Sequence, residues 1–280
     1  MERFGARLAQ RVAKHGPVCV GVDPHSALLE AWGLPDTPEG LERFCAITVD
    51  ALADITAVVK PQSAFFERFG SAGIAVLEST IRQFRQQGVL ILLDVKRGDI
   101  GSTAQAYAQA YLSPESPLYS DALTVSPYLG FGTLAPFVEV ARAHGGGLFT
   151  LAVTSNPEAS QVQQAQVSDG RRVSQVVIDA VADLNAGGGR DGDFGIVFGA
   201  TATGVEADLS RLGGPILAPG MGAQGGRPED LGPRFESAHG LVLPAYAREL
   251  LSYGPDTLRL RHAVEAAQDA CRNVLTYTDL

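Results

Sequence analysis

The segment VLILLDVK, residues 89–96, is an unbroken run of apolar residues that ends in charged ones. It contains Asp94 and Lys96, and Arg97 and Asp99 follow directly after it. Continuous rather than alternating hydrophobicity is typical of a strand covered on both faces, as in a parallel sheet wrapped by helices. The segment therefore predicts a buried parallel strand whose carboxyl end carries several opposite charges.

Segments of the same kind recur along the chain, each followed by a polar or charged residue and then by a longer stretch of helical character. The expected strands lie at residues 18–23, 57–62, 89–96, 121–128, 147–155, 194–201, 215–222 and 240–247. Helical stretches between them include residues 39–55, 71–87, 133–145, 171–186 and 255–275. Eight such units in succession favour a (β/α)₈ barrel, the TIM-barrel fold of the α/β class, over an open sheet.

Length and composition fit one barrel domain. The chain has 280 residues, and barrels of this kind often form a single domain of about 250 residues. Hydrophobic residues make up 45% and charged residues 19% of the chain, which is ordinary for a globular protein. No low-complexity linker divides it, so we expect a single domain over residues 1–280, with a closing helix in segment 255–280.

The charge balance limits the possible partners. Lys and Arg number 22 against 31 Asp and Glu, a formal net charge of −9, so a broad electrostatic grip on nucleic acid is not expected. An anionic substrate would have to be held by local positive groups. No signal-peptide pattern opens the chain, and no apolar run reaches the ~18 residues that a membrane span needs. These features predict a soluble protein without membrane contacts.

The cysteines and histidines show no metal-site spacing. Cys19, Cys45 and Cys271 are odd in number and far apart, which fits neither a disulfide framework nor a zinc site. We interpret them as buried thiols of a protein in the reducing cytoplasm. The five histidines also lack the spacing of metal ligands. The sequence therefore gives no reason to expect a bound metal.

Polar residues stand where the expected strands end, which is where a barrel of this kind builds its active site. Asp94 and Lys96 are two apart on one strand, so both side chains are expected to face the barrel mouth. Lys60 ends the neighbouring strand, and Asp99 lies beyond Lys96. Opposite charges in alternation would keep the lysines protonated, and an ammonium can protonate a developing carbanion. A purely structural ion pair is the alternative. The other strand-end residues are Asp23, Ser126, Ser155, Gln224 and Arg248.

A glycine-rich segment follows the seventh expected strand. PGMGAQGGRPEDLG contains G-x-G-x-x-G at Gly220, Gly222 and Gly225, but a dinucleotide fingerprint should open the first strand–helix unit and be followed by an acid at the end of the second strand. Neither holds here. We interpret the segment as a phosphate cradle with inward-pointing amides, because barrels often bind phosphate after strands seven and eight. Arg248 could add bidentate contacts, or be a solvated helix charge.

The polar stretch PEASQVQQAQVSDGRR, residues 157–172, is too long for a simple turn from strand to helix. It could be a lid that closes over the barrel mouth. An inert surface insertion is an equally reasonable interpretation.

Four motifs resemble the orotidine 5′-phosphate decarboxylase family, in its longer bacterial branch. They are VVKPQSAFFERFG around Lys60, DVKRGDI from Asp94, TSNP from Thr154 and PGMGAQGG from Pro219. The resemblance runs from about residue 18 to residue 250. D-x-K-x-x-D alone is shared with sugar-phosphate decarboxylases of the same superfamily, whereas the combination is highly specific. The resemblance implies decarboxylation of orotidine 5′-phosphate to UMP and CO₂, the last step of de novo pyrimidine nucleotide synthesis, without a cofactor.

The resemblance also implies roles for single residues at the reacting end of the substrate. Lys96 would donate the proton to C6 of the pyrimidine, and Asp94 would lie against the substrate carboxylate. Asp23 and Lys60 would hydrogen-bond the ribose hydroxyls. Ser155 would read the edge of the pyrimidine.

Two further implications concern the phosphate and a second subunit. The 5′-phosphate would be held by Arg248 and the loop residues Pro219, Gly220, Gly222, Gln224 and Gly225. Ala247 precedes this arginine, where family members usually have a small polar residue. Asp99, Ile100 and Thr103 would reach into the active site of a second subunit, which implies a homodimer with shared sites.

Two other classes stay open. A metal-dependent sugar-phosphate decarboxylase or aldolase of the same superfamily would use the acidic residues to bind Mg²⁺, and a chelator would then abolish its activity. A non-enzymatic phosphoribosyl-binding sensor would bind UMP without consuming the orotidine nucleotide.

Overall fold

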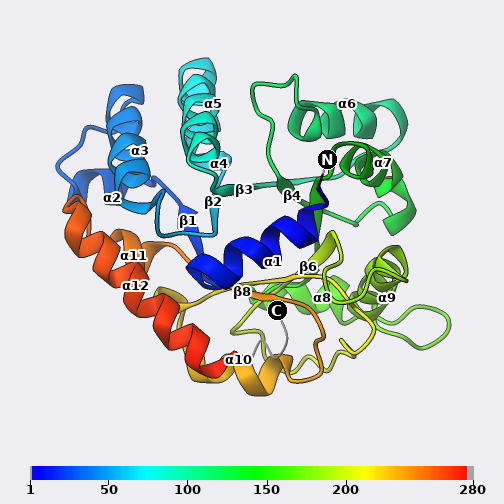
Figure 1. Cartoon of the computed structure of the whole chain (residues 1–280). Coiled ribbons are helices and arrows are strands. Elements are labelled where there is room, and N and C mark those ends of the chain that lie inside the picture. Colours follow the sequence, from blue (N-terminus) through cyan, green and yellow to red (C-terminus); the bar gives the residue numbers. More distant parts are fainter. Residues whose placement is uncertain (1, 276–280) are drawn as a thin grey trace.

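Eight parallel strands form a closed barrel in the computed structural model, which describes residues 2–275 (Figure 1). Neighbours around the barrel follow chain order, and β8 pairs with β1 to close it. The strands are β1 Cys19–Val22, β2 Val58–Pro61, β3 Leu90–Arg97, β4 Ala122–Val125, β5 Gly147–Val153, β6 Phe194–Phe198, β7 Ile216–Pro219 and β8 Val242–Tyr246. Seven of these strands lie inside their predicted segments, and β3 runs one residue past its own. The predicted barrel is confirmed.

Helices surround the barrel (Figure 1). They are α1 Phe4–His15, α2 Ser26–Ala31, α3 Pro38–Leu52, α4 Ala64–Glu67, α5 Gly70–Gln86, α6 Gly101–Leu112, α7 Ala135–His144, α8 Ser160–Gln163, α9 Val173–Asn185, α10 Pro228–Phe235, α11 Arg248–Leu251 and α12 Thr257–Val274. The five helical stretches named from the sequence correspond to α3, α5, α7, α9 and α12. Residues 199–215, between β6 and β7, run as turns and bends. Residues 276–280 of the predicted closing segment lie outside the described residues.

Helix α1 closes the amino-terminal end of the barrel and crosses its centre in Figure 1. Phe4, Leu8 and Val12 recur every four residues, so they share one face of the helix. All three are buried in one cluster with strand residues such as Leu92. Phe4 meets Phe149 of β5 edge-on, with ring centroids 6.1 Å apart. The opening of the barrel is therefore at the carboxyl ends of the strands.

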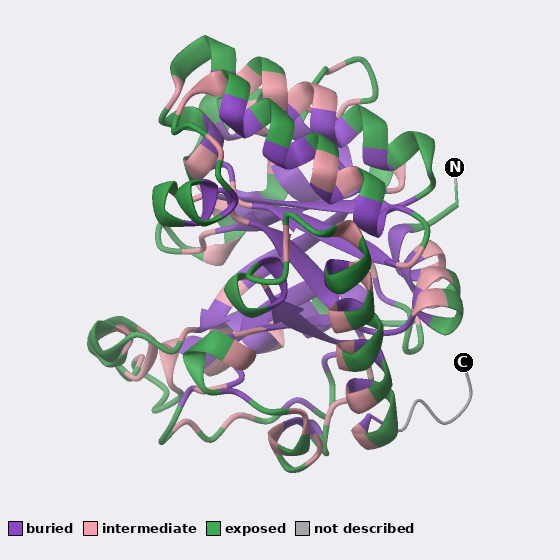
Figure 2. Ribbon diagram, turned by 90° about the vertical axis from the view of Figure 1, so that its left-hand side faces the viewer, coloured by how far each residue is buried: buried purple, intermediate pink, exposed green. Residues whose placement is uncertain are grey.

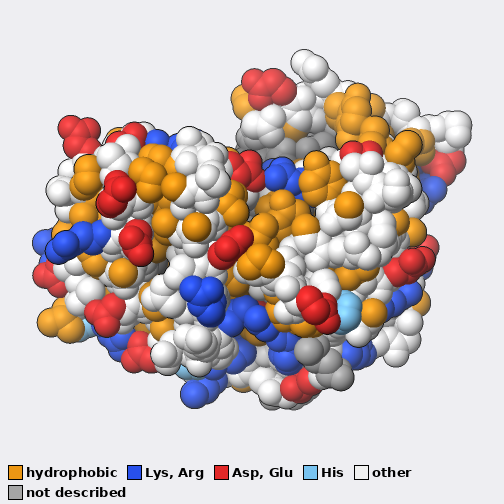
Figure 3. Space-filling view, turned by 90° about the horizontal axis from the view of Figure 1, so that it is seen from above, with side chains coloured by type: hydrophobic (Ala, Val, Ile, Leu, Met, Phe, Trp, Pro, Cys, Tyr) orange, Lys and Arg blue, Asp and Glu red, His pale blue; other side chains and the backbone are white. Residues whose placement is uncertain are grey.

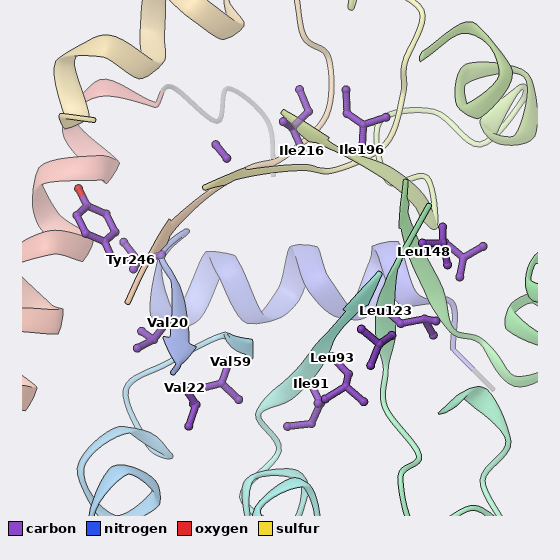
Figure 4. Close-up of a cluster of buried hydrophobic side chains, with 14 of the residues drawn as sticks. Val20, Val22, Val59, Ile91, Leu93, Leu123, Leu148, Ile196, Ile216 and Tyr246 are labelled. Atoms are coloured by element: carbon purple, nitrogen blue, oxygen red, sulfur yellow. The ribbon is translucent and has the colours of Figure 1, made fainter. Parts of the chain in front are cut away.

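The strands are buried on both faces, which explains the unbroken apolar run in β3. Ile91 and Leu93 point outward from the barrel (Figure 4) and belong to the layer under the helices. Leu90 and Leu92 alternate with them and pack inside, in the cluster with α1. Each fully buried Leu or Ile side chain stabilises the fold by about 1.5–3 kcal/mol. Neither face of β3 can therefore carry polar residues until the strand reaches the barrel mouth.

The outer surface is polar and mixed in charge. Exposed residues lie on the outer faces of the helices around a buried sheet (Figure 2), and acidic, basic and apolar side chains are interspersed over the face shown in Figure 3. Among residues 2–275 no helix is long and apolar enough to cross a membrane.

The three cysteines are free and buried, as predicted, and burial raises the pKa of the Cys19 thiol to about 12.

Candidate active site

A cavity of about 240 Å³ opens at the carboxyl ends of the strands. Eight of the fourteen site residues predicted from the sequence line it: Asp23, Lys60, Asp94, Lys96, Pro219, Gly220, Gln224 and Arg248. They come from the ends of β2, β3 and β7 and from the segments that follow β1, β7 and β8. The barrel thus brings together side chains that lie as far apart in sequence as residues 23 and 248.

One carboxylate and two ammonium groups meet in this cavity. Lys60 Nζ donates to Asp94 Oδ2 at 3.0 Å, and Lys96 Nζ donates to Asp94 Oδ1 at 2.5 Å. Lys60 and Asp94 are only 7% and 6% exposed. Burial by itself would lower the pKa of Lys60, but Asp94 and Asp23 raise that pKa above its ordinary value. Burial would likewise raise the pKa of Asp94, which the two lysines instead hold well below its usual range.

The backbone at Lys96 departs from a regular strand. Its φ is +46°, and among residues 2–275 it is the only residue other than glycine with a positive φ. The pairing of β3 with β4 shifts register between Leu93 and Arg97. The side chains of Asp94 and Lys96 do meet, as predicted. They do so on an irregular strand end, and not through the regular alternation of side chains that the prediction assumed. A backbone strained in this way costs about 1–3 kcal/mol and persists only where its surroundings hold it.

Thr124 of β4 holds this strand end, and it was not among the predicted site residues. Its Oγ1 donates to Asp94 Oδ1 at 2.8 Å. The same oxygen accepts from the backbone N–H of Val95 at 3.1 Å and of Lys96 at 2.9 Å. Thr124 is 1% exposed. The sequence signal for it was a single polar residue inside the apolar run ALTV, since a buried hydroxyl needs a partner.

Thr124→Val should lower the free energy of unfolding by about 2–3 kcal/mol, because the near-isosteric change leaves two buried amides and one carboxylate oxygen short of a partner. Chemical denaturation measures this loss. Thr124→Ser keeps the hydroxyl and is the matched control. Equal stability of the Val and Ser variants would show that the hydroxyl does not hold the strand end.

Two groups in the cavity are available to a ligand. Asp23 Oδ1 is buried and has no hydrogen-bond partner among the described residues. Arg248, the first residue of α11, is exposed, and its guanidinium makes no hydrogen bond or ion pair within residues 2–275. A buried acceptor without a partner favours binding of a hydroxyl, and an unpaired guanidinium favours an anion. The cavity can therefore hold a molecule that carries both.

The glycine loop after β7 corrects one expectation. The N–H of Gly222 donates to Gly226 O at 2.8 Å, and the N–H of Gly225 donates to Gly222 O at 2.7 Å. These amides are paired inside the loop, so they are not free to hold a phosphate as predicted, and neither Gly222 nor Gly225 lines the cavity. Gly222 has φ +65°, and a Cβ there would lie 1.9 Å from Glu249 Oε2. The turn itself explains this glycine, which leaves the Gln224 side chain and Arg248 as the clearer phosphate donors.

Four other predicted residues lie outside the cavity of this chain. Ser155 is exposed just beyond β5, whereas its neighbour Thr154 lines the cavity. Asp99, Ile100 and Thr103 lead from β3 into α6, and Asp99 Oδ1 accepts from the N–H of Ile100 at 2.8 Å. Within this chain Lys96 pairs with Asp94 alone among the described carboxylates. The contribution of Asp99 to the site of a second subunit therefore stays a prediction.

The predicted lid segment is attached to the cavity wall through one side chain. It contains a short 3₁₀ helix at Pro157–Ala159, and α8 follows it. The Gln163 side chain accepts from the N–H of Thr154 at 2.8 Å and donates to Thr154 Oγ1 at 2.8 Å. Because Thr154 lines the cavity, a movement of this segment would displace a residue of the cavity wall.

A family model described as orotidine 5′-phosphate decarboxylase / HUMPS family matches residues 16–248. The chain belongs to this family. The orotidine 5′-phosphate decarboxylases of Salinispora tropica and Streptomyces coelicolor are 59% and 51% identical to it, each over 99% of this chain and 99% of the relative. The crystal structure of a Streptomyces avermitilis protein assigned as an orotidine 5′-phosphate decarboxylase matches it with a TM-score of 0.93 and 52% identity, over 98% of this chain and 96% of that one.

These matches confirm the resemblance seen in the four motifs. Those motifs cover only short stretches, whereas the identity to orotidine 5′-phosphate decarboxylases extends over almost the whole chain. The Lys60–Asp94–Lys96 cluster lies within the matched residues. The charged cavity is therefore built from residues inside the region that the family model matches.

Proposed function

We propose that this protein decarboxylates orotidine 5′-phosphate to UMP and CO₂, the last step of de novo pyrimidine nucleotide synthesis. The observation that carries the proposal is the Lys60–Asp94–Lys96 cluster in the cavity of a chain that belongs to the decarboxylase family. Lys60 and Asp94 are buried, and the Lys96 side chain, which is 46% exposed, lines the cavity above them. Such a fixed set of charges is what this reaction requires, because its difficulty is electrostatic.

The cavity offers a partner for each end of the nucleotide. Arg248 and the Gln224 side chain would hold the 5′-phosphate, the arginine through bidentate contacts. Asp23 Oδ1, which lacks a partner in the part of the chain described, would accept from a ribose hydroxyl beside Lys60. Binding at these two ends would place the pyrimidine over Lys96, and binding energy from the phosphate can act in the transition state.

Loss of CO₂ leaves an electron pair on C6 of a ring that has no electron sink. The bond between C6 and the carboxylate breaks, and its electrons remain on C6. The Lys96 ammonium, fixed on Asp94 before the substrate arrives, would stabilise this charge and donate the proton that forms the new C6–H bond. The neutral amine would then regain a proton from water. Asp94 would lie against the departing carboxylate.

We further propose that the reaction needs no metal. Both oxygens of Asp94 bond to ammonium or hydroxyl groups, and two positive charges beside that carboxylate disfavour a divalent cation there. Purified protein should therefore consume orotidine 5′-phosphate at the same rate with and without EDTA, followed by the loss of substrate absorbance. A Mg²⁺ requirement would favour the sugar-phosphate enzymes, and UMP binding without substrate loss would favour a sensor.

A homodimer with shared sites is also proposed. Ile100 is 61% exposed, and Tyr128 and Leu129, which follow the neighbouring strand β4, are 78% and 53% exposed. Exposed apolar side chains that follow the carboxyl ends of two neighbouring strands favour a contact surface there. A second copy on this surface would bring Asp99 and Thr103 of each chain to the cavity of the other.

Mixing Asp99→Ala chains with Lys96→Ala chains should restore activity to a preparation of two inactive variants. Each mixed dimer would contain one site with both substitutions and one intact site, so about a quarter of the wild-type activity is expected from random pairing. Decarboxylation after subunit exchange measures it. Verified mixed dimers that stay inactive would show that each site is complete within one chain.

Two finer features complete the proposal. Segment 157–172 would act as a lid, because Gln163 attaches it to Thr154 in the cavity wall, and its closure would exclude water.

We also propose a cytoplasmic location, which is supported by three free, buried thiols.

A further inference from the structure

Arg97, which follows the catalytic lysine in the chain, has no part in the mechanism above, yet its side chain turns back past Lys96. Arg97 Nη1 donates to the carbonyl of Val95 at 3.2 Å, so the guanidinium spans the Lys96 peptide. Arg97 Nη2 donates to Glu67 Oε1, at the end of α4, at 2.8 Å. An arginine can make both bonds at once because its donors form a rigid, planar fork.

Glu67 in turn is tied to the backbone just before Lys96. Its Oε1 accepts from Ser63 Oγ at 2.5 Å, and the N–H of Ser63 donates to the carbonyl of Asp94 at 3.2 Å. The contacts therefore form a ring that leaves β3 at Asp94, passes through Ser63, Glu67 and Arg97, and returns to β3 at Val95. Ser63 is buried, only 4% exposed, and so holds one side of this ring in place.

Two aromatic rings of α6 also contact the guanidinium. Arg97 Cζ lies 5.5 Å from the ring centroid of Tyr107 and 6.0 Å from that of Tyr111, both on α6. These distances are within the range of cation–π contacts. The Arg97 side chain is 29% exposed and that of Glu67 is 40% exposed, so an ion pair alone would contribute little to stability.

The ring surrounds the one strained position of the site. Lys96 has a left-handed backbone, which only a well-determined environment can hold. Thr124 holds its amide from the side of β4, and the Arg97–Glu67 pair closes the side of α4. We propose that Arg97 and Glu67 are positioning residues that keep the Lys96 ammonium on Asp94 for proton transfer, an inference that rests on the proposed function.

Arg97→Met should lower kcat by about 10- to 100-fold, since small displacements of a reacting group have effects of this size. KM and the Kd for UMP should stay within about threefold of wild type, because a group that acts only in the transition state changes kcat and kcat/KM together. Glu67→Gln keeps the shape and loses the charge, and a smaller decrease in kcat is expected. Arg97→Lys should be intermediate, because one ammonium cannot span both acceptors.

Arg261→Met is the matched control. Arg261 also donates to a backbone carbonyl, that of Ala51 at 3.1 Å, and to a carboxylate, that of Asp54, and its side chain is 26% exposed. This pair joins α12 to the end of α3, away from the cavity lining. Its loss should lower stability about as much as loss of Arg97, with kcat unchanged.

Each outcome decides between positioning and general stability. Wild-type kcat in Arg97→Met and Glu67→Gln, or an equal loss of kcat in Arg261→Met, would overturn the inference. If Arg97→Met does not fold, Glu67→Gln decides alone. A wild-type protein that leaves orotidine 5′-phosphate unchanged would remove the proposed function and this inference together, whereas an active wild type with unaffected variants would remove only the inference.

Discussion

Lys96→Ala should lower kcat for decarboxylation by about 10⁴-fold or more, because the site loses both its proton donor and the charge that stabilises the carbanion. The Kd for UMP should change less than tenfold, since the phosphate and ribose contacts remain. Single-turnover kinetics and an equilibrium titration with UMP separate the two effects. The chain has three lysines, and Lys14→Ala, in α1 at the closed end of the barrel, is the matched control with normal kcat.

Lys96→Arg distinguishes the charge from the proton. Arginine keeps a positive charge in the cavity but does not release its proton in proteins. A large loss of kcat in this variant is therefore expected as well. Near-normal decarboxylation by either Lys96 variant would contradict the proposed role, since neither chain could then supply the proton at that position.

Asp94→Asn should lower the free energy of unfolding by about 3–5 kcal/mol and abolish measurable turnover. The change leaves the buried Lys60 ammonium without its partner, which is the costly way to break a buried pair. It also releases the Lys96 ammonium. Denaturation curves and kcat measure the two losses. Asp121→Asn is the matched control. Asp121 lies just before β4, is 2% exposed and pairs with Arg7, so its substitution should lower stability and leave kcat unchanged.

The difference in stability between the wild type and Asp94→Asn should depend on pH, in a direction that the two pKa shifts determine. In the wild type the raised pKa of Lys60 stabilises the fold below its ordinary value of about 10.4, and that contribution disappears as pH rises through the folded pKa. The lowered pKa of Asp94 stabilises the fold above about pH 4, and that contribution disappears as pH falls. The stability gap between wild type and Asp94→Asn should therefore be widest at neutral pH and narrow below pH ~4. A gap independent of pH would show that the charge is not its source.

The strand pattern could be predicted from the sequence because burial on both faces leaves a direct mark. Residues 89–93 of the third strand contain no polar residue, and the structure buries Ile91 and Leu92 on opposite faces. The same reasoning placed Asp94 and Lys96 at the barrel mouth. A buried strand end does not carry a charge unless the charge has a partner or a function. The position of Asp94, the first carboxylate after the apolar run, therefore indicated the site.

Hydrogen-bond partners could not be predicted in the same way. Thr124 differed from the rest of its apolar run only in being polar, because periodicity shows which face a residue occupies and not what its hydroxyl contacts. The left-handed backbone of Lys96 is contacted by Thr124 of β4, and the next residue, Arg97, is bonded to Glu67 of α4. The amides of Gly222 and Gly225 are taken up by carbonyls of their own loop, and the loop conformation that pairs them is not visible in a glycine pattern.

The position of C6 relative to Lys96 decides whether this lysine can be the proton donor. A crystal structure of the protein with bound UMP should show C6 about 3–3.5 Å from Lys96 Nζ, with the phosphate on Arg248 and Gln224 and a ribose hydroxyl on Asp23. A pyrimidine bound elsewhere in the cavity, or with C6 turned away from an ammonium that still pairs with Asp94, would contradict the account.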